Sequence, residues 1–377
     1  MANSALEKIN IKLDLDALVE QMSVADKQLI AISRALLQNA QLIIMDEPTT
    51  ALTQTEVKSL FKVIKSLQAK GMSILFVSHK LNEVQEISDR TLILRNGKKI
   101  ADEPASEIDR AKLVFYMTGK EISESSYVYE PKANCPDCLL KVENLTSPGR
   151  FYDISFDLQP GEIVGITGLL GSGRTELALS LFGVWPAEQG SISINDKEIK
   201  INSIQDAVVH GIGYVPEDRL TEGLFLPQSI GKNLIIRKMD ELLTKSHLID
   251  SQLVEKEISR WVTNLNIKTP NANLPVQSLS GGNQQRVVLA KWLASNPKIL
   301  ILNGPTVGVD VGSKSDLHEV MRNLAREGMG LLVMSDDIPE LLATCNRILL
   351  MRKGRIVEAF DRSSVTEKEL NLKLVEA

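Results

Sequence analysis

The chain has 377 residues, of which 43% are hydrophobic and 24% are charged, and its formal net charge is −5. This length allows two domains that each bury a core, and the composition is that of a globular protein rather than a disordered one. The acidic balance, the aromatic content of only 4% and the lack of long Lys and Arg runs argue against a nucleic-acid partner.

An internal repeat begins near the N-terminus and keeps one register. The segment from Met22 reads MSVADKQLIAISRALLQNAQLIIMDEPTTAL, and it aligns without a gap with the segment from Leu279, which reads LSGGNQQRVVLAKWLASNPKILILNGPTVGV. The offset is 257 positions throughout, and it pairs Asp46 with Asn303. We therefore expect two copies of one fold.

Each copy predicts alternating helices and strands. In the first copy, apolar residues at helical spacing predict a helix that ends near Gly71: Val57, Leu60, Phe61, Ile64 and Leu67. Residues 73–77 then predict a buried strand. In the second copy, the matching helix carries Leu317, Met321 and Leu324, and the matching strand covers residues 331–334. This alternation predicts an α/β fold with a parallel sheet between helices.

A linker is predicted at residues 120–137, where Ser, Glu and Pro accumulate and hydrophobic periodicity stops. It separates residues 1–119, the C-terminal part of a first domain, from residues 138–377, a complete second domain. Much more sequence precedes the repeat in the second domain than in the first. We expect the first domain to lack about 115 residues, which is roughly half of an ordinary domain.

The cysteine usage and the lack of a recognisable targeting signal predict a cytoplasmic chain. Three cysteines do not make a disulfide framework, and no stretch has the length and apolarity of a membrane span or signal peptide. Cys135 and Cys138 form a CPDC motif, a pattern that occurs both as half of a zinc site and as a redox pair. Because no second such motif or His pair accompanies it, we interpret it as part of the linker.

A glycine-rich loop follows the strand-like run 162–167. It consists of Gly168, Leu169, Leu170, Gly171, Ser172, Gly173, Arg174, Thr175 and Glu176. The spacing fits the phosphate loop G-x4-G-K-[ST], except that Arg174 replaces Lys with a larger, planar cation. Glycines let backbone N–H groups approach phosphate oxygens, and the next helix directs its positive end at them. We expect nucleotide binding, with the Thr175 hydroxyl offered to Mg²⁺; the alternative is an ordinary strand-to-helix turn.

The run 279–285, LSGGNQQ, resembles the signature motif LSGGQ of ATP-binding-cassette (ABC) ATPases. Together with the glycine-rich loop and the strand end MDEPT at 45–49, the resemblance covers nearly the whole chain. The fused double cassette, the GRT of the loop and YVPEDR at 214–219 resemble the ATPase subunits of ribose-, galactose- and xylose-type importers. The resemblance implies P-loop NTPase cassettes, each with a parallel sheet core and antiparallel β and α-helical subdomains, in two tandem copies of which the first is incomplete.

The resemblance implies two composite ATP sites, because cassettes of this family close head to tail. The first site would join Asp46, Glu47 and His79 to the signature residues Ser280, Gly281, Gly282, Asn283 and Gln284. Asp46 would hold Mg²⁺ through water, Glu47 would orient or deprotonate the attacking water, and His79 would contact the γ-phosphate. This site needs a phosphate loop that a neighbouring polypeptide or an upstream segment supplies, or that has been lost.

The second site would pair the glycine-rich loop with the first copy's signature, which reads MSVAD at 22–26. At four functional positions of this site the residue differs from the one that the family has. Asn303 and Gly304 stand where the family has Asp and Glu, Asp336 replaces the switch histidine, and Glu217 replaces the Q-loop glutamine. Perturbing metal ligands, even outer-sphere ones, commonly costs roughly 10- to 100-fold in affinity. We expect this site to bind ATP rather than hydrolyse it. Phe151 or Tyr152 either stacks on adenine or belongs to the core.

The resemblance implies an ATP- and Mg²⁺-dependent, energy-coupling subunit. It would lie on the inner face of the cell membrane beneath a transmembrane sugar permease, served by a periplasmic or extracellular sugar-binding protein and by a second cassette chain. A non-catalytic ATP-binding regulatory protein is the main alternative, favoured by Asn303 and Gly304. A translation-factor cassette is disfavoured by the acidic balance.

Overall fold

The computed structural model describes residues 17–375 except 20, 21, 23, 39, 50, 51, 53, 79, 96, 120–128, 130–137 and 245. The chain divides into two units, residues 1–122 and 123–377, which are described separately below. His79, Ser23 of the first signature, Cys135 and nearly all of the predicted linker lie outside the described residues.

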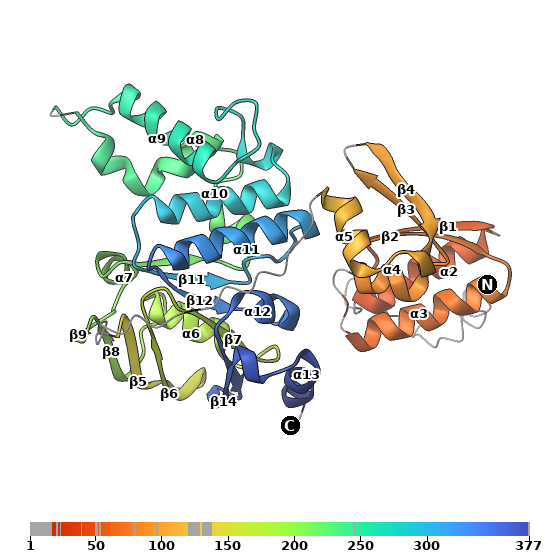
Figure 1. Cartoon of the computed structure of the whole chain (residues 1–377), viewed down its shortest axis with the longest axis horizontal. Coiled ribbons are helices and arrows are strands. Elements are labelled where there is room, and N and C mark those ends of the chain that lie inside the picture. Colours follow the sequence, from red (N-terminus) through yellow and green to blue (C-terminus); the bar gives the residue numbers. More distant parts are fainter. Residues whose placement is uncertain are drawn as a thin grey trace. The chain divides into compact units, whose positions relative to one another are not determined.

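Unit 1 combines short strands with helices (Figure 1). Its elements are α2 (Val24–Leu37), β1 (Leu42–Asp46), α3 (Gln54–Ala69), β2 (Ser73–Val77), α4 (Leu81–Ile87), β3 (Arg90–Arg95), β4 (Lys98–Pro104), η2 (Ala105–Glu107) and α5 (Arg110–Thr118). Strands β1 and β2 pair in parallel, and β3 and β4 pair antiparallel. The predicted apolar face of α3 is buried against Ile43 and Met45 of β1, which forms the core of this unit.

Unit 2 contains two sheets. Its first half comprises β5 (Leu140–Ser147), β6 (Phe151–Leu158), β7 (Ile163–Thr167), α6 (Arg174–Leu181), β8 (Gln189–Ile194), β9 (Lys197–Ile199), α7 (Ile204–Val209), β10 (Ile212–Val215) and η3 (Arg219–Gly223). The six-stranded sheet has the order β10-β11-β12-β7-β13-β14, and the four-stranded antiparallel sheet has the order β6-β5-β8-β9.

The rest of unit 2 supplies most of its helices. These elements are α8 (Ile230–Ile235), η4 (Ile236–Leu242), α9 (Ser251–Asn264), η5 (Val276–Ser278), α10 (Gly281–Leu293), β11 (Ile299–Asn303), α11 (Val311–Arg326), β12 (Gly330–Met334), α12 (Ile338–Thr344), β13 (Arg347–Arg352), β14 (Arg355–Asp361), η6 (Arg362–Ser364) and α13 (Glu367–Val375). Figure 1 shows α8 and α9 at one end of the unit, next to α10, with the antiparallel sheet at the other end. The parallel core with α-helical and antiparallel parts matches the predicted fold class.

The central strands of unit 2 are apolar at nearly every position, and this composition explains their place. All five residues of β7, of β11 and of β12 are buried, as expected for parallel strands covered on both faces. Each pairs in parallel with its neighbour, so their C-terminal ends meet at one edge of the sheet. The glycine-rich loop begins after β7 at that edge. Asn303, the last residue of β11, lies at the same edge.

The repeat predicted from the sequence extends through the secondary structure. At an offset of 257, α2, β1, α3, β2, α4, β3, β4 and α5 of unit 1 correspond to α10, β11, α11, β12, α12, β13, β14 and α13 of unit 2. One expectation is wrong. Residues 73–77 form a strand, but Leu75 and Val77 are exposed, because the described part of unit 1 covers only the other face of β2.

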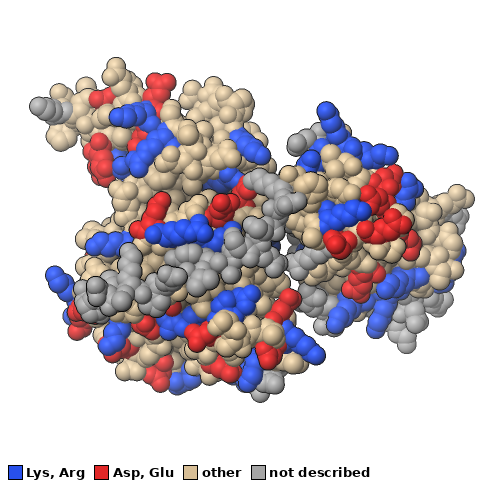
Figure 2. All heavy atoms as spheres, viewed as in Figure 1, with Lys and Arg blue, Asp and Glu red and all other residues tan. Residues whose placement is uncertain are grey.

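The surface of each unit mixes both signs of charge. On the face shown in Figure 2, Lys and Arg side chains alternate with Asp and Glu side chains over both units. None of the helices formed by the described residues is long and apolar enough to cross a membrane.

Candidate functional site

The glycine-rich loop connects the buried strand β7 to helix α6. Gly171 and Gly173 have φ values of 78° and 96°, in the left-handed region that side chains disfavour. Gly168 lies so close to its surroundings that a Cβ there would collide with the carbonyl oxygen of Met351 and with Ser172. The loop therefore depends on glycine at these positions, and its backbone N–H groups lie at the N-terminal end of α6.

Arg174, which replaces the usual lysine, folds back across this loop. Its Nη1 donates a hydrogen bond of 2.6 Å to the carbonyl oxygen of Gly168, and the side chain is buried. Its Nη2 also lies 3.6 Å from the carboxylate of Asp336, the residue at the switch-histidine position. The guanidinium thus joins the first residue of the loop to the end of β12.

A cavity of about 430 Å³ opens beside the loop. Its lining consists of Thr175, Leu179, Tyr214, Glu217, Asp218, Arg219, Leu220, Glu222, Asn303, Val307 and Gly308. The cavity brings together Thr175, Glu217 and Asn303, which the sequence analysis selected from three distant segments. A cavity of this size and polarity suits a small molecule.

Asn303, the last residue of β11, lines this cavity and is nearly fully buried. Its Nδ2 donates to the hydroxyl of Tyr214 at 3.4 Å, so the amide directs its nitrogen at the tyrosine. Burial raises the pKa of Tyr214 to about 12, which keeps the phenol neutral at physiological pH. Sequence analysis missed Tyr214 as a contact of Asn303, because only the fold shows that β10 pairs with β11.

Glu217 lies beside Gly304, the position at which the resemblance stated above implies a second carboxylate. Gly304 has a φ of 56°, and a Cβ built on it would lie 3.0 Å from the Cγ of Glu217. The side chain of Glu217 therefore packs over the bare backbone of Gly304. This arrangement brings one carboxylate to the cavity wall although position 304 has none.

Arg219 links this cavity to the signature segment. Its guanidinium donates to the carbonyl oxygens of Val307 at 2.6 Å and Gly308 at 3.0 Å, and its Nε lies 3.4 Å from Oε1 of Gln284. It begins the π-helical turn η3, a rare element that often marks functional positions. Sequence analysis used Arg219 only as part of a family pattern and missed its role, because these contacts join residues far apart in the chain.

The signature residues begin helix α10 and do not line the cavity. Ser280 precedes the first turn, and its Oγ accepts a hydrogen bond of 2.9 Å from Nδ2 of Asn283. Oδ1 of Asn283 accepts from the backbone N–H of Lys268 at 2.8 Å. Gly281 approaches Arg219 and Gly282 approaches Ser313 too closely for a side chain at either position. The start of α10 therefore depends on glycine at both positions, and Ser280 before it is exposed to solvent.

The carboxylates of unit 1 that the sequence analysis selected lie at the C-terminal edge of its parallel strands, which corresponds to the edge of unit 2 that carries Asn303. Asp46 is the exposed last residue of β1, and Glu47 follows with a φ of 45°. The backbone N–H of Glu47 donates to the carbonyl oxygen of Val77 at 2.9 Å, which fixes the turn after β1 to the end of β2. Two adjacent carboxylates at the C-terminal ends of parallel strands occupy the edge where open α/β sheets bind ligands.

Phe151 and Tyr152 differ because successive residues of a strand point to opposite faces. Phe151 is fully buried, so its assignment to the core is right and stacking on a ligand is excluded for it. Tyr152 is exposed; its hydroxyl accepts from the N–H of Gly149 at 2.8 Å, and Arg355 lies over its ring.

The chain matches known proteins over nearly its whole length. Residues 1–50 and 151–307 match the family model described as ABC transporter. The "Ribose import ATP-binding protein RbsA" of Clostridium perfringens strain 13 is 40% identical over 365 residues, 97% of this chain and 72% of that protein. A "Putative ribose/galactose/methyl galactoside import ATP-binding protein" of Geobacillus kaustophilus is 38% identical over 97% of this chain and 72% of its own length.

The solved structures agree in fold. A nucleotide-free ATP-binding cassette from an ABC transporter superposes with a TM-score of 0.54 at 21% identity, over 63% of this chain and 98% of its own.

Proposed function

Because the chain belongs to the ABC transporter family, we propose that it is the ATP-binding, energy-coupling subunit of a carbohydrate import system. It is an ATPase of the ABC type that works with transmembrane permease subunits. The similarity to ribose and galactoside import proteins extends over 97% of the chain and so includes both units. The observation that carries the proposal is the cavity that joins Thr175, Glu217 and Asn303 beside the glycine-rich loop.

In unit 2, we propose that residues 168–176 hold the phosphates of ATP through backbone N–H groups, with Arg174 supplying positive charge. Thr175 and Asn303 both line the cavity and carry a hydroxyl and an amide oxygen, and Mg²⁺ prefers oxygen ligands. These residues fit a Mg²⁺ ion, which Thr175 would hold and which Asn303 would contact through water. When bound, the ion would neutralise phosphate charge, and Glu217 would orient a water molecule beside it.

In unit 1, we propose that Asp46 and Glu47 perform the hydrolytic roles, together with His79. Asp46 would hold a Mg²⁺ ion through water, and Glu47 orients the attacking water and takes its proton. The left-handed backbone of Glu47 and its bond to Val77 fix the main chain from which the carboxylate extends, and preorganisation of this kind lowers the cost of reaching the transition state. In unit 2, the start of helix α10 offers a γ-phosphate the signature residues Ser280, Gly281, Gly282, Asn283 and Gln284.

We also propose a place for the subunit in the cell. It lies on the inner face of the membrane beneath the permease, which receives its sugar from a periplasmic or extracellular binding protein. A second cassette chain completes the assembly.

Uptake of labelled sugar tests this function. Deletion of the gene should abolish uptake of ribose, galactose or xylose, and the wild-type gene should restore it. The Glu47→Gln variant should restore less than a tenth of the uptake, whereas the exposed Glu107→Gln variant of η2 should restore all of it. Full restoration by Glu47→Gln would favour a regulatory ATP-binding protein, and unchanged uptake of all three sugars in the deletion strain would refute carbohydrate import.

A further inference from the structure

A carboxylate of helix α4 joins the ends of two neighbouring strands in unit 1. Thr49, which follows Glu47 by two residues, donates a hydrogen bond of 2.5 Å from its Oγ1 to Oε2 of Glu83. The Nζ of Lys80 lies 3.3 Å from Oε1 of Glu83 and donates to the carbonyl oxygen of Thr49 at 2.9 Å. Thr49, Lys80 and Glu83 thus form a closed ring of contacts, the Glu83 ring, in which Thr49 is fully buried. The ring connects the turn after β1, which carries Glu47, to the segment after β2.

The internal repeat shows which part of this arrangement both units share. The carboxylate and two hydroxyl donors recur in unit 2 at the repeat offset of 257, as Glu340, Thr306 and Ser335. Glu340 is buried, and it accepts hydrogen bonds from Thr306 at 2.7 Å and from Ser335 at 2.6 Å. The second donor of unit 1 is Ser78, whose Oγ lies 3.5 Å from Oε2 of Glu83. In both units, one carboxylate therefore fastens the turn after one parallel strand to the end of the next strand.

The ammonium of Lys80 distinguishes the ring of unit 1. Its counterpart in unit 2 is Asp337, which has no side-chain proton to donate and bonds to Lys314 of α11 at 2.9 Å. In unit 1, the cation ties the carbonyl oxygen of Thr49 to Glu83 in addition to the hydroxyl. The turn is therefore held by two bonds in the unit that carries Glu47.

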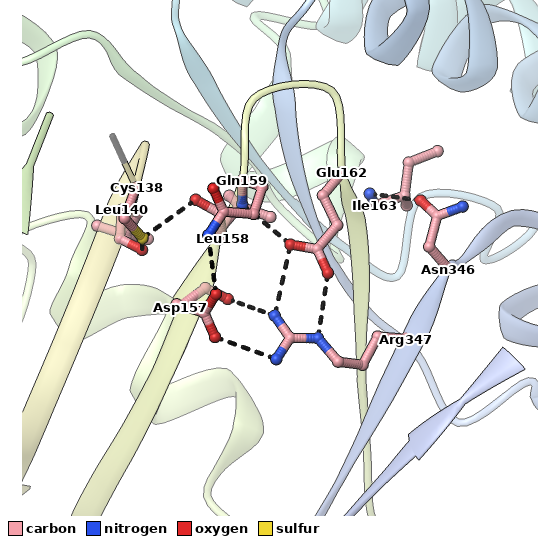
Figure 3. A network of polar contacts seen from close by, with 9 residues as sticks. All are labelled: Cys138, Leu140, Asp157, Leu158, Gln159, Glu162, Ile163, Asn346 and Arg347. Carbon is pink, nitrogen blue, oxygen red and sulfur yellow. Dashed lines mark hydrogen bonds and ion pairs between the residues drawn. The ribbon is translucent and has the colours of Figure 1, made fainter. Parts of the chain in front are cut away.

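The place of the Glu83 ring in the sheet separates it from ion pairs that only join strands. In unit 2, Arg347 at the start of β13 bonds to Glu162 immediately before β7 and to Asp157 near the end of β6 (Figure 3). Strands β7 and β13 run in parallel and both begin there, so this network lies at the edge opposite to the glycine-rich loop. The Glu83 ring lies where β1 and β2 end, which is the edge of the candidate site in unit 1.

We propose that Glu83 is a positioning residue for ATP hydrolysis, which holds the turn that carries Glu47 through its bonds to Thr49 and Lys80. The inference rests on the hydrolytic role proposed for Glu47. A general base must lie within hydrogen-bond distance of the water that it deprotonates, and a displacement of about 1 Å can cost roughly 100-fold in rate. Glu83 acts on this distance from the far side of the turn, without contact with the nucleotide.

ATP turnover by the import complex, purified with its permease subunits, tests this role. Glu83→Gln preserves the size of the side chain but removes its charge and one of its two acceptor oxygens. We expect kcat to fall about 10-fold or more while KM for ATP changes less than about twofold, because Glu83 positions the base of the chemical step and not the nucleotide. In a chain that already carries Glu47→Gln, the added Glu83→Gln should lower kcat less than about twofold, because both changes act through the same carboxylate.

Thr49 offers a second test in case Glu83→Gln impairs folding. Thr49→Val removes the hydroxyl that bonds to Glu83 and should also lower kcat about 10-fold, whereas Thr49→Ser keeps the hydroxyl and should retain at least half of the wild-type kcat. Two further variants serve as controls. Glu86→Gln makes the same change at an exposed position of α4, and Asp157→Asn breaks a bond of the network in Figure 3. Both should leave kcat unchanged, although Asp157→Asn should lower the midpoint of thermal unfolding.

The outcomes separate this inference from the proposed function. An unchanged kcat in Glu83→Gln or Thr49→Val would overturn the inference, and so would a rise in KM that accounts for the whole loss of activity. A full 10-fold loss from Glu83→Gln in the Glu47→Gln background would also overturn it, because Glu83 would then act independently of Glu47. If Glu47→Gln alone leaves turnover unchanged, the hydrolytic role proposed for unit 1 fails and the inference fails with it. A loss with Glu47→Gln but none with Glu83→Gln refutes the inference alone.

Discussion

The guanidinium of Arg174 lies 3.6 Å from the carboxylate of Asp336 while it donates a hydrogen bond to the carbonyl oxygen of Gly168. The cation of the glycine-rich loop is therefore partly neutralised by an acidic residue at the end of β12. Asp336 is largely exposed, so water screens the pair and its own contribution to stability is small. A phosphate that approaches this loop meets a negative charge beside the positive one.

Asp336→Asn should tighten ATP binding by unit 2. Removal of one negative charge beside the phosphates should lower the free energy of binding by about 1 kcal/mol, or roughly fivefold in Kd. Isothermal titration calorimetry at low and high salt checks this, because salt should reduce the difference. The exposed Asp240→Asn variant of η4 serves as the control, and equal or weaker binding by Asp336→Asn would contradict the prediction.

Asn303→Asp should make ATP binding depend more strongly on Mg²⁺. The new carboxylate replaces the amide at the cavity wall and restores charge for a hydrated metal, so we expect affinity for Mg²⁺-ATP to rise about 10-fold. Without Mg²⁺, the same substitution should weaken ATP binding, because a buried carboxylate then repels the phosphates.

Titration of nucleotide with Mg²⁺ and with EDTA measures both effects on Asn303→Asp. Tyr214→Phe is the matched control, since it removes the hydroxyl beside Asn303 without adding charge. The same change in affinity in both media would show that residue 303 does not act through the metal.

The parallel sheet and the loop could be predicted because local sequence determines both. The strands β7, β11 and β12 consist of apolar runs, and Gly171 and Gly173 of the loop have backbone angles that only glycine adopts readily. The burial of residues 73–77 could not be predicted, because apolarity shows that a strand can be covered but not whether a covering element is present. The contacts of Arg219 with Val307 and Gly308 depend on the folding of distant segments together, and no local pattern indicates them.

Gly168→Ala should destabilise unit 2 more than Gly171→Ala. The new methyl at position 168 would collide with the backbone of Met351, which cannot move without disturbing β13, so we expect a loss of about 1–3 kcal/mol. At position 171 the methyl meets open space, and only the left-handed backbone costs energy, about 1 kcal/mol. Urea unfolding followed by tryptophan fluorescence compares the two variants, and equal losses would show that the packing at position 168 does not matter for stability.

Lys291 should make the stability of unit 2 rise at alkaline pH. Burial, assisted by the charge of Arg237, lowers the pKa of this lysine from 10.5 to about 8 in the folded chain. Between these values the unfolded chain binds a proton that the folded chain does not, so stability increases with pH in this window. The cost of keeping the lysine charged is fully present below about pH 8 and is relieved as the pH approaches 10.5, which amounts to about 2 kcal/mol between pH 7 and pH 9.5.

The Lys291→Met variant isolates this effect from other titrating groups. It removes the charge while it preserves most of the side-chain volume, but it also leaves the carbonyl oxygen of Gly223 without the ammonium that bonds to it. Loss of this bond should change the free energy of unfolding of the variant by an amount that does not depend on pH. From pH 7 to pH 9.5, the free energy of unfolding of the wild-type chain should rise by about 2 kcal/mol relative to that of the variant. Urea unfolding of both chains across this range measures the difference, and parallel curves would show that the lysine keeps an ordinary pKa and that its burial is relieved by water.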